Sequence, residues 1–284
     1  MATSDQRRRE LARKKFERQQ ARRAQRRKTR RRNAVVAAGL AVLLVAGAAA
    51  AGTAGLFDGG AAKNGDADSA ASGSPSAPPT SAAPDPCGKP AKGEPATERW
   101  KKEPPLTVDR SAEYVMELET TCGDISVTMD AAKAPHTVNS FAFLAGKGYF
   151  DHTRCHRLTE SGIYVLQCGD PEGTGQGGPG YTIPDENLGD ARVKEGVYPA
   201  GTVAMANKYN AAEKKGRDSG GSQFFLVYQD SQLPPDYTPF GTVGEEGMKV
   251  LEKIAEAGAA PPDATQNTPP NATVVIDKAT VRKS

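Results

Sequence analysis

The segments Cys155-His156-Arg157-Leu158, Tyr164-Val165-Leu166-Gln167 and Ser222-Gln223-Phe224-Phe225 decide how this chain is interpreted. The first two have the pattern of short, paired β-strands, and the third follows later in the chain. Together they place one permanent cation, two side-chain amides and several aromatic rings on a β framework. No hydrolytic nucleophile stands out among them. The predicted site is therefore a shallow apolar pocket beside a fixed positive charge.

The sequence around these segments predicts a mainly β domain. Alternating apolar residues on either side of 120–123 predict a hairpin. Helices are expected from Pro135 to about Gly146 and from about Met248 to Gly258. Short strands are expected at 153–158, 163–168, 200–206, 222–228 and 273–281. Many short strands with long Gly-rich connections favour a closed antiparallel barrel, and a barrel filled with side chains leaves its outer face for the site.

The order of these motifs resembles the cyclophilin family of peptidyl-prolyl isomerases, from about Glu113 to the C-terminus. The resemblance implies a closed eight-stranded antiparallel β-barrel capped by two α-helices. It also implies an enzyme that acts on X-Pro bonds of polypeptides, with no cofactor and no metal. The residues that match the family are Arg157, Gln167, Met205, Ala206, Asn207, Gln223, Phe224 and Leu233.

The chemistry of X-Pro rotation suits these residue types. No bond is broken, so the reaction needs a donor aimed at the prolyl nitrogen, whose lone pair localises when amide resonance is lost. We expect Arg157 to supply that donor, with Gln167 and Gln223 orienting it and holding the carbonyl before proline. Asn207 is expected to pair with the substrate backbone. The predicted apolar cup for the proline ring consists of Met205, Phe224 and Leu233 with Tyr164.

A non-catalytic alternative uses the same groove. A chaperone or binding module could grip Pro-containing segments there with little turnover. Binding alone does not need a cation at the imide nitrogen, so the presence of Arg157 favours the enzyme.

The chain departs from the family pattern at several positions. Tyr164 stands where the family usually has Phe, and Ile163 could take that role instead. Near the tip of the site Gln232 and Tyr237 replace a Trp and a His of the eukaryotic cytosolic pattern. Because the inhibitor cyclosporin contacts that Trp, we expect weak cyclosporin binding. The segment 207–222 is also long and basic; it either biases substrate choice or is solvated surface.

The N-terminal part of the chain differs sharply in charge from the rest. Residues 1–32 carry 15 Lys and Arg against 3 Asp and Glu, out of 37 and 34 in the whole chain, which leaves 22 and 31 for the remainder. No charged residue occurs from Asn33 to Phe57, a run long enough to cross a hydrocarbon core of about 30 Å as a helix. The basic flank predicts a cytoplasmic N-terminus and an extracytoplasmic domain in a single-pass protein of the cell membrane. A cleaved signal sequence is the alternative.

These features divide the chain into four parts. We expect a basic cytoplasmic arm at 1–33, a transmembrane helix or signal sequence at 34–57, a flexible linker and lead-in at 58–111 and the isomerase domain at 112–284. The linker is rich in Ala, Gly, Ser and Pro, a composition that cannot bury enough surface to become ordered. The arm is expected to meet anionic lipid rather than nucleic acid, because it nearly lacks aromatic residues to stack on bases. Nothing in the sequence demands more than a monomer.

Four cysteines allow two bridges in an exported domain. Cys155 and Cys168 fall on neighbouring predicted strands, which favours a cross-strand disulfide, and Cys87 with Cys122 would then tie the lead-in to the first hairpin. Buried free thiols are the alternative. The cysteines and histidines do not have zinc-like spacing, and the glycine-rich run 173–180 lacks the Gly-Lys-Ser/Thr ending of a phosphate loop.

Overall fold

An antiparallel hairpin opens the folded domain. It joins β1 (Tyr114–Thr120) to β2 (Gly123–Met129) and pairs Met116 with Val127 and Leu118 with Ile125. These apolar residues alternate with polar ones, so one face of the hairpin is buried in the core while the other meets solvent. Gly123 closes the turn with φ +131°, a conformation that residues with a Cβ rarely adopt.

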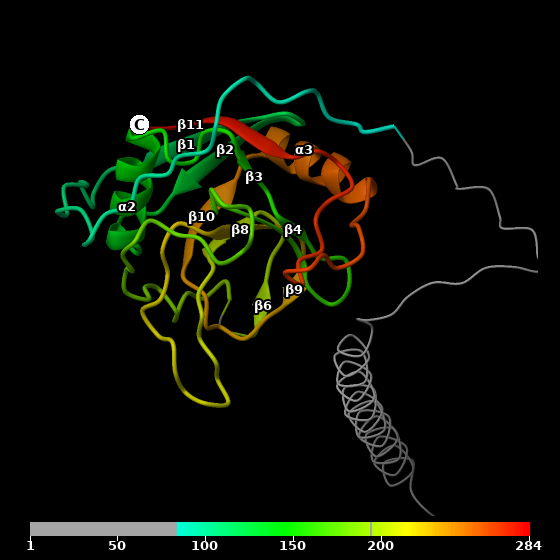
Figure 1. Ribbon diagram of the computed structural model, residues 1–284. Coiled ribbons are helices and arrows are strands. Elements are labelled where there is room, and N and C mark those ends of the chain that lie inside the picture. Colours follow the sequence, from blue (N-terminus) through cyan, green and yellow to red (C-terminus); the bar gives the residue numbers. More distant parts are fainter. Residues whose placement is uncertain (1–83, 194) are drawn as a thin grey trace, which may run out of the picture. The chain divides into compact units, whose positions relative to one another are not determined.

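Two helices pack on the sheet and lie at opposite sides of it (Figure 1). Helix α2 (Pro135–Gly146) begins with proline, and its N-terminal N–H groups at His136 and Thr137 donate to the Glu186 carboxylate at 3.0 and 2.9 Å. This distant carboxylate does the work of a cap, which the side chain of Ala134 cannot do. Helix α3 (Glu245–Glu256) carries acidic residues in its first turn and buries Leu251 and Ile254. Both helices were predicted.

One curled sheet of nine antiparallel strands forms the body of the domain, with the order β3-β11-β1-β2-β10-β7-β8-β5-β4. The remaining strands are β3 (Thr153–Arg154), β4 (Arg157–Leu158), β5 (Tyr164–Cys168), β7 (Thr202–Met205), β8 (Phe224–Gln229), β10 (Pro239–Val243) and β11 (Val275–Lys283). Strands β6 (Val197–Tyr198) and β9 (Ser231–Gln232) form a separate small ladder.

The predicted closed eight-stranded barrel is not confirmed. The sheet has nine strands, and its order has two ends, β3 and β4. Only residues 155 and 156 separate these ends along the chain. The N–H of Cys155 donates to Val274 O at 2.9 Å and that of His156 to Gln167 O at 3.1 Å. One continuous segment therefore bonds to both sides of the curled sheet, although β3 and β4 form no ladder with each other.

Aromatic side chains fill the interior of the sheet. Phe141 packs against Phe150, Phe224 and Phe240, with ring centroids 5.2, 5.5 and 4.7 Å apart. All four side chains are fully buried. A core filled in this way leaves the outer face of the sheet for a binding site.

Both disulfides considered from the sequence are present. Cys155 is bonded to Cys168 beneath the predicted site, and Cys87 is bonded to Cys122 beside the first hairpin. The segment before β1 (cyan in Figure 1) runs along the domain towards α2. The Asn139 side chain of α2 donates to Pro105 O at 3.0 Å and accepts from Thr107 N–H at 2.9 Å. The lead-in therefore packs on the domain along its length.

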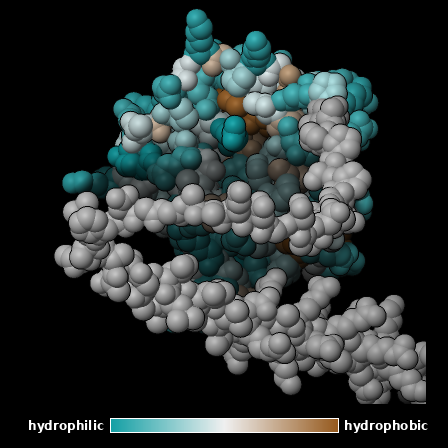
Figure 2. Space-filling model, turned by 45° about the vertical axis from the view of Figure 1, so that its right-hand side comes forward, coloured by the Kyte–Doolittle hydropathy of each residue, from teal (hydrophilic) through white to brown (hydrophobic). Residues whose placement is uncertain are grey.

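The computed structural model describes residues 84–193 and 195–284. The predicted basic arm, the transmembrane helix or signal sequence and most of the linker lie outside these residues. Within the described part, no helix is both long and apolar enough to cross a bilayer. The surface of this part is largely hydrophilic in the view of Figure 2, and its one exposed large apolar side chain is Leu106.

Candidate active site

Strand register brings the predicted cation, an amide and an aromatic ring onto one face of the sheet. Arg157 of β4 pairs with Gln167 of β5, and Gln167 pairs with Phe225 of β8. Residues directly opposite each other on paired strands project to the same face, so these three side chains share the outer face. Arg157 is exposed, and no ion pair or side-chain hydrogen bond to another described residue engages its guanidinium.

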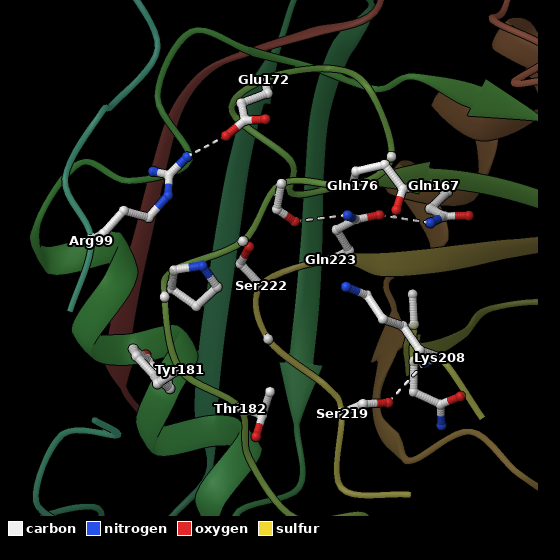
Figure 3. Close-up of a pocket in the computed structure, with 18 residues that line it drawn as sticks. Arg99, Gln167, Glu172, Gln176, Tyr181, Thr182, Lys208, Ser219, Ser222 and Gln223 are labelled. Carbon is white, nitrogen blue, oxygen red and sulfur yellow. Dashed lines mark hydrogen bonds and ion pairs between the residues drawn. The ribbon is translucent and has the colours of Figure 1, made fainter. Parts of the chain in front are cut away.

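Two side-chain amides form a chain of hydrogen bonds beside the arginine. Gln167 Nε2 donates to Gln223 Oε1 at 2.9 Å, and Gln223 Nε2 donates to Gly177 O at 2.9 Å (Figure 3). Each amide is therefore oriented by its neighbour. Gln167 Oε1 is left without a protein donor among the described residues.

A second, smaller apolar cluster lies on the same face as Arg157. Its buried members include Val165, Phe225 and Leu233, and Ile163, Ala206 and Tyr237 pack against it while remaining partly exposed. The Phe225 and Tyr237 rings meet edge to face at 5.4 Å. We call these six residues the outer apolar cluster. It provides an apolar surface next to a free cation.

Two tyrosines, the buried Tyr198 and the partly buried Tyr237, hold the edge of this cluster. Tyr198 O–H donates to Tyr237 O at 2.7 Å, and Tyr237 N–H donates to Tyr198 Oη at 3.1 Å. Burial raises the pKa of Tyr198 to about 12. Burial and the nearby Asp236 also raise the pKa of Tyr237, while the positive charge of Arg157 acts in the opposite direction. Both hydroxyls therefore stay protonated at neutral pH.

A pocket of about 620 Å³ lies on the other side of the two glutamines. A glycine-rich wall, residues 175–180, faces Asn207 and Lys208 across it, and Gln167, Ala206 and Gln223 line it as well. Figure 3 shows the Lys208 side chain directed into this pocket. Ala206 belongs to both the pocket and the outer apolar cluster, so the two surfaces are continuous.

A buried carboxylate organises the start of this wall. The Asp170 side chain accepts N–H donors from Glu172, Gly175 and Gly177 at 2.9, 2.6 and 3.1 Å. Burial by itself raises the pKa of Asp170, but these N–H donors outweigh it and the net shift is downward. The carboxylate stays ionised and holds the loop in its curled conformation.

His156 lies directly before Arg157 and is buried. Its ring nitrogens have no hydrogen-bond partner among the described residues. Burial lowers its pKa, and the charge of Asp170 opposes that shift only in part. The ring is therefore neutral at neutral pH, and Arg157 is the only one of the two residues that carries charge there.

The structure gathers most of the predicted site residues. Arg157, Gln167, Gln223, Ala206, Leu233 and Tyr237 lie on the outer face or line the pocket. Asn207 is there too, but its side chain is engaged, because Nδ2 donates to Asp236 O at 2.8 Å and Oδ1 accepts from Tyr209 N–H at 3.1 Å. These bonds fix the side chain, and one Nδ2–H and one Oδ1 lone pair remain for a ligand.

Three predicted cup residues do not face this site. Phe224 is fully buried inside the sheet against Phe141 and Phe150, so its assignment to the cup was wrong. Met205 pairs with Phe224 across the strands and shares the interior cluster. Tyr164 packs against Tyr228, with ring centroids 5.9 Å apart, away from the outer apolar cluster.

Phe225, Val165 and Ile163 take the places of those three residues. Ile163 had been considered from the sequence, but Phe225 and Val165 had not. The signal was available, because side chains two apart on a strand share a face. Gln223 and Gln167 therefore predict Phe225 and Val165 as their companions.

The long basic loop 207–222 projects from the domain (yellow in Figure 1). The Arg217 guanidinium stacks over the Tyr209 ring at 3.5 Å and pairs with Asp185 at 3.4 Å. Lys214 and Lys215 are exposed. The loop thus has a fixed base beside the pocket and a solvated tip.

Comparisons with known proteins show which family model, relatives and solved structures this chain resembles. The family model "Cyclophilin type peptidyl-prolyl cis-trans isomerase/CLD" matches residues 115–281. The chain is similar to a "Probable peptidyl-prolyl cis-trans isomerase B" of Mycobacterium leprae, at 45% identity over 181 residues, which is 61% of this chain and 56% of that relative. A protein of the same name from Mycobacterium tuberculosis is 46% identical over 157 residues, 52% of this chain and 49% of that relative. The chain thus spans about half the length of these curated relatives.

Among solved structures, a cyclophilin type peptidyl-prolyl cis-trans isomerase from Cryptosporidium parvum aligns with 61% of this chain and 99% of its own, at 26% identity and a TM-score of 0.47. A second structure of the same protein was obtained in the presence of the dipeptide Ala-Pro, and it aligns at 27% identity and a TM-score of 0.46.

Proposed function

Because the chain belongs to the cyclophilin-type peptidyl-prolyl cis-trans isomerase family, we propose that it accelerates cis-trans rotation of X-Pro bonds in polypeptides. The observation that carries the proposal is the exposed guanidinium of Arg157, which faces Gln167 and has no partner among the described residues. A structural arginine would be expected to pair with a carboxylate. This one is free to meet a substrate.

The proposed mechanism rests on differential binding. The uncatalysed rotation has a barrier of about 20 kcal/mol because amide resonance keeps the bond planar. In the twisted state the prolyl nitrogen regains a lone pair that can accept a hydrogen bond from Arg157. The planar isomers offer no such lone pair, so the arginine stabilises the transition state more than either ground state.

The hydrogen bond from Arg157 cannot supply the whole rate enhancement, so other residues of the site must contribute. Shortening a process of tens of seconds to milliseconds requires about four decades, or roughly 5–6 kcal/mol. One hydrogen bond to a charged group supplies only about 1.5–3 kcal/mol. The outer apolar cluster would hold the proline ring and exclude water, and the glutamine amides would hold the preceding carbonyl. A fixed ring and a fixed carbonyl leave rotation as the free coordinate.

We further propose that the substrates are exported proteins and that the domain acts outside the cytoplasm on a membrane anchor. The uncharged run at 34–57 after a basic arm supports an anchor. Two disulfides suit an oxidising compartment. Protease treatment of intact cells tests this topology, because a protected domain would contradict it.

A protease-coupled assay on a proline-containing peptide tests the activity. Wild-type protein should accelerate the slow isomerisation phase, and Arg157→Ala should lose most of that acceleration. Arg154→Ala is the matched control, since Arg154 is also an exposed arginine and lies on β3, which precedes β4 along the chain. Peptide binding without acceleration by the wild type would instead identify a binding module. Equal rates for wild type and Arg157→Ala would reject the arginine mechanism.

A further inference from the structure

The lead-in segment, residues 87–108, is anchored to the domain at both ends although it precedes the family match at 115–281. At its start Cys87 is bonded to Cys122, and Gly88 N–H donates to Thr121 O at 2.7 Å. Near its end Thr107 N–H donates to the Asn139 side chain at 2.9 Å. The residues between these anchors are therefore held against the domain surface.

The middle of the lead-in contacts the glycine-rich wall of the pocket and also Glu172, which lies shortly before the wall in the same loop. Arg99 Nη2 lies 2.7 Å from Glu172 Oε1 (Figure 3), and Trp100 N–H donates to Pro179 O at 2.8 Å. The approach is close: a Cβ added to Gly180, whose φ is +91°, would lie 2.7 Å from Trp100 O. Only glycine fits there while the lead-in is in place.

The wall in turn reaches the site amides. Gly177 O accepts a hydrogen bond from Gln223 Nε2 at 2.9 Å, and Gln223 Oε1 accepts one from Gln167 Nε2 at the same distance. Gln167 faces Arg157 across the β4–β5 ladder. A movement of the wall would therefore change the orientation of both amides next to the arginine.

A second contact chain runs through aromatic rings. The Trp100 ring packs against Phe143 at 5.1 Å and against Tyr149 at 5.8 Å. Tyr149 Oη lies 3.5 Å from Ser222 Oγ, and Ser222 immediately precedes Gln223. Trp100 thus supports the amide pair by two routes, through Tyr149 and Ser222 and through the wall.

We propose that Arg99 and Trp100 are positioning residues for isomerisation, holding the wall so that Gln223 and Gln167 keep the orientation that faces Arg157. This inference rests on the proposed function. The lead-in is then a working part of the site, contributed by sequence outside the segment that defines the family.

Arg99→Ala in the full chain tests the proposal by two readouts, kcat/KM on a proline peptide and the NMR signals of the Gln167 and Gln223 side-chain NH₂ groups. We expect both sets of signals to shift and kcat/KM to fall about three- to tenfold, mainly in kcat. The charge swap Arg99→Glu with Glu172→Arg should restore both. Asp109→Ala is the matched control, because it removes another exposed ion pair of this region, with Lys283 at 2.9 Å, that does not touch the wall.

The outcomes separate the two proposals. The positioning role is overturned if Asp109→Ala changes both readouts as much as Arg99→Ala does. It is also overturned if the charge swap restores neither kcat/KM nor the amide signals. If the wild type has no isomerase activity, the proposed function fails, and the amide signals still test the lead-in. Unshifted amide signals in Arg99→Ala would overturn the positioning role alone.

Discussion

Two adjacent phenylalanines should separate activity from stability. Phe224 projects into the core between Phe141 and Phe150, whereas Phe225 projects to the outer face beside Leu233 and Tyr237. We expect Phe225→Ala to damage isomerisation by the folded protein, and Phe224→Ala to damage folding without changing the activity of the protein that remains folded. The activity of the folded fraction should therefore distinguish the two variants.

The expected sizes follow from what each ring contacts. Phe→Ala at a fully buried site costs about 3–5 kcal/mol of unfolding free energy, which applies to Phe224. A proline ring exposes three CH₂ groups, and burying each contributes about 0.8 kcal/mol, or roughly 2.4 kcal/mol in all. Without the Phe225 ring, about half to all of this 2.4 kcal/mol should be lost. That loss corresponds to a roughly 8- to 60-fold fall in kcat/KM.

Urea unfolding and a protease-coupled isomerase assay at low temperature measure these effects on the same samples. Phe224→Ala should keep kcat/KM within about twofold once corrected for its folded fraction, because its ring does not reach the outer face. Phe225 is itself buried in its cluster, so Phe225→Ala should also lose stability, but here the folded fraction should lose activity. If Phe224→Ala inactivates the folded protein while Phe225→Ala does not, the assignment of faces is refuted.

Three further predictions concern charge and inhibition. Burial lowers the pKa of His156 below its usual 6.5, so at acidic pH the unfolded chain binds a proton that the folded chain does not, and stability should fall as the pH drops below about 6.5. His156→Gln should make the urea midpoint less dependent on pH between about 7.5 and 5. A wild-type midpoint that does not change over this range would contradict the prediction. Lys208 points into the pocket without an acidic partner among the described residues, so peptides with Glu shortly before the X-Pro pair should bind more tightly than those with Gln at low salt; a preference that survives Lys208→Ala would refute the role. By the sequence resemblance, Gln232 and Tyr237 replace the Trp and His of the eukaryotic cytosolic pattern, so calorimetry should show weak cyclosporin binding, and undiminished affinity would refute that expectation.

The sequence predicted the elements whose patterns are long. Helix α2 begins at the predicted proline and ends at the predicted glycine, and the first hairpin turns where expected. The two-residue strands β6 and β9 were missed, because two residues cannot show a period. Strand β10 was missed as well, since its sequence Pro239-Phe240-Gly241-Thr242-Val243 contains Pro and Gly, which weaken a strand signal.

The site was predicted by residue type but not fully by face. Arg157, Gln167 and Gln223 were found because their chemistry is distinctive. Phe224 was chosen over Phe225 because both belong to one motif, and only strand alternation tells them apart. The contacts of Arg99 and Glu172 could not be predicted, since they join residues far apart in sequence through a surface loop.

NMR exchange measurements on a proline peptide give both the dissociation constant and the rate of rotation on the protein, and Arg157→Ala should change them unequally. The rate should fall at least about tenfold, the effect of one charge-assisted hydrogen bond, while the dissociation constant changes less than about threefold. A rate that stays at the wild-type value, or a loss of binding that accounts for the whole loss of rate, would contradict selective stabilisation of the twisted imide.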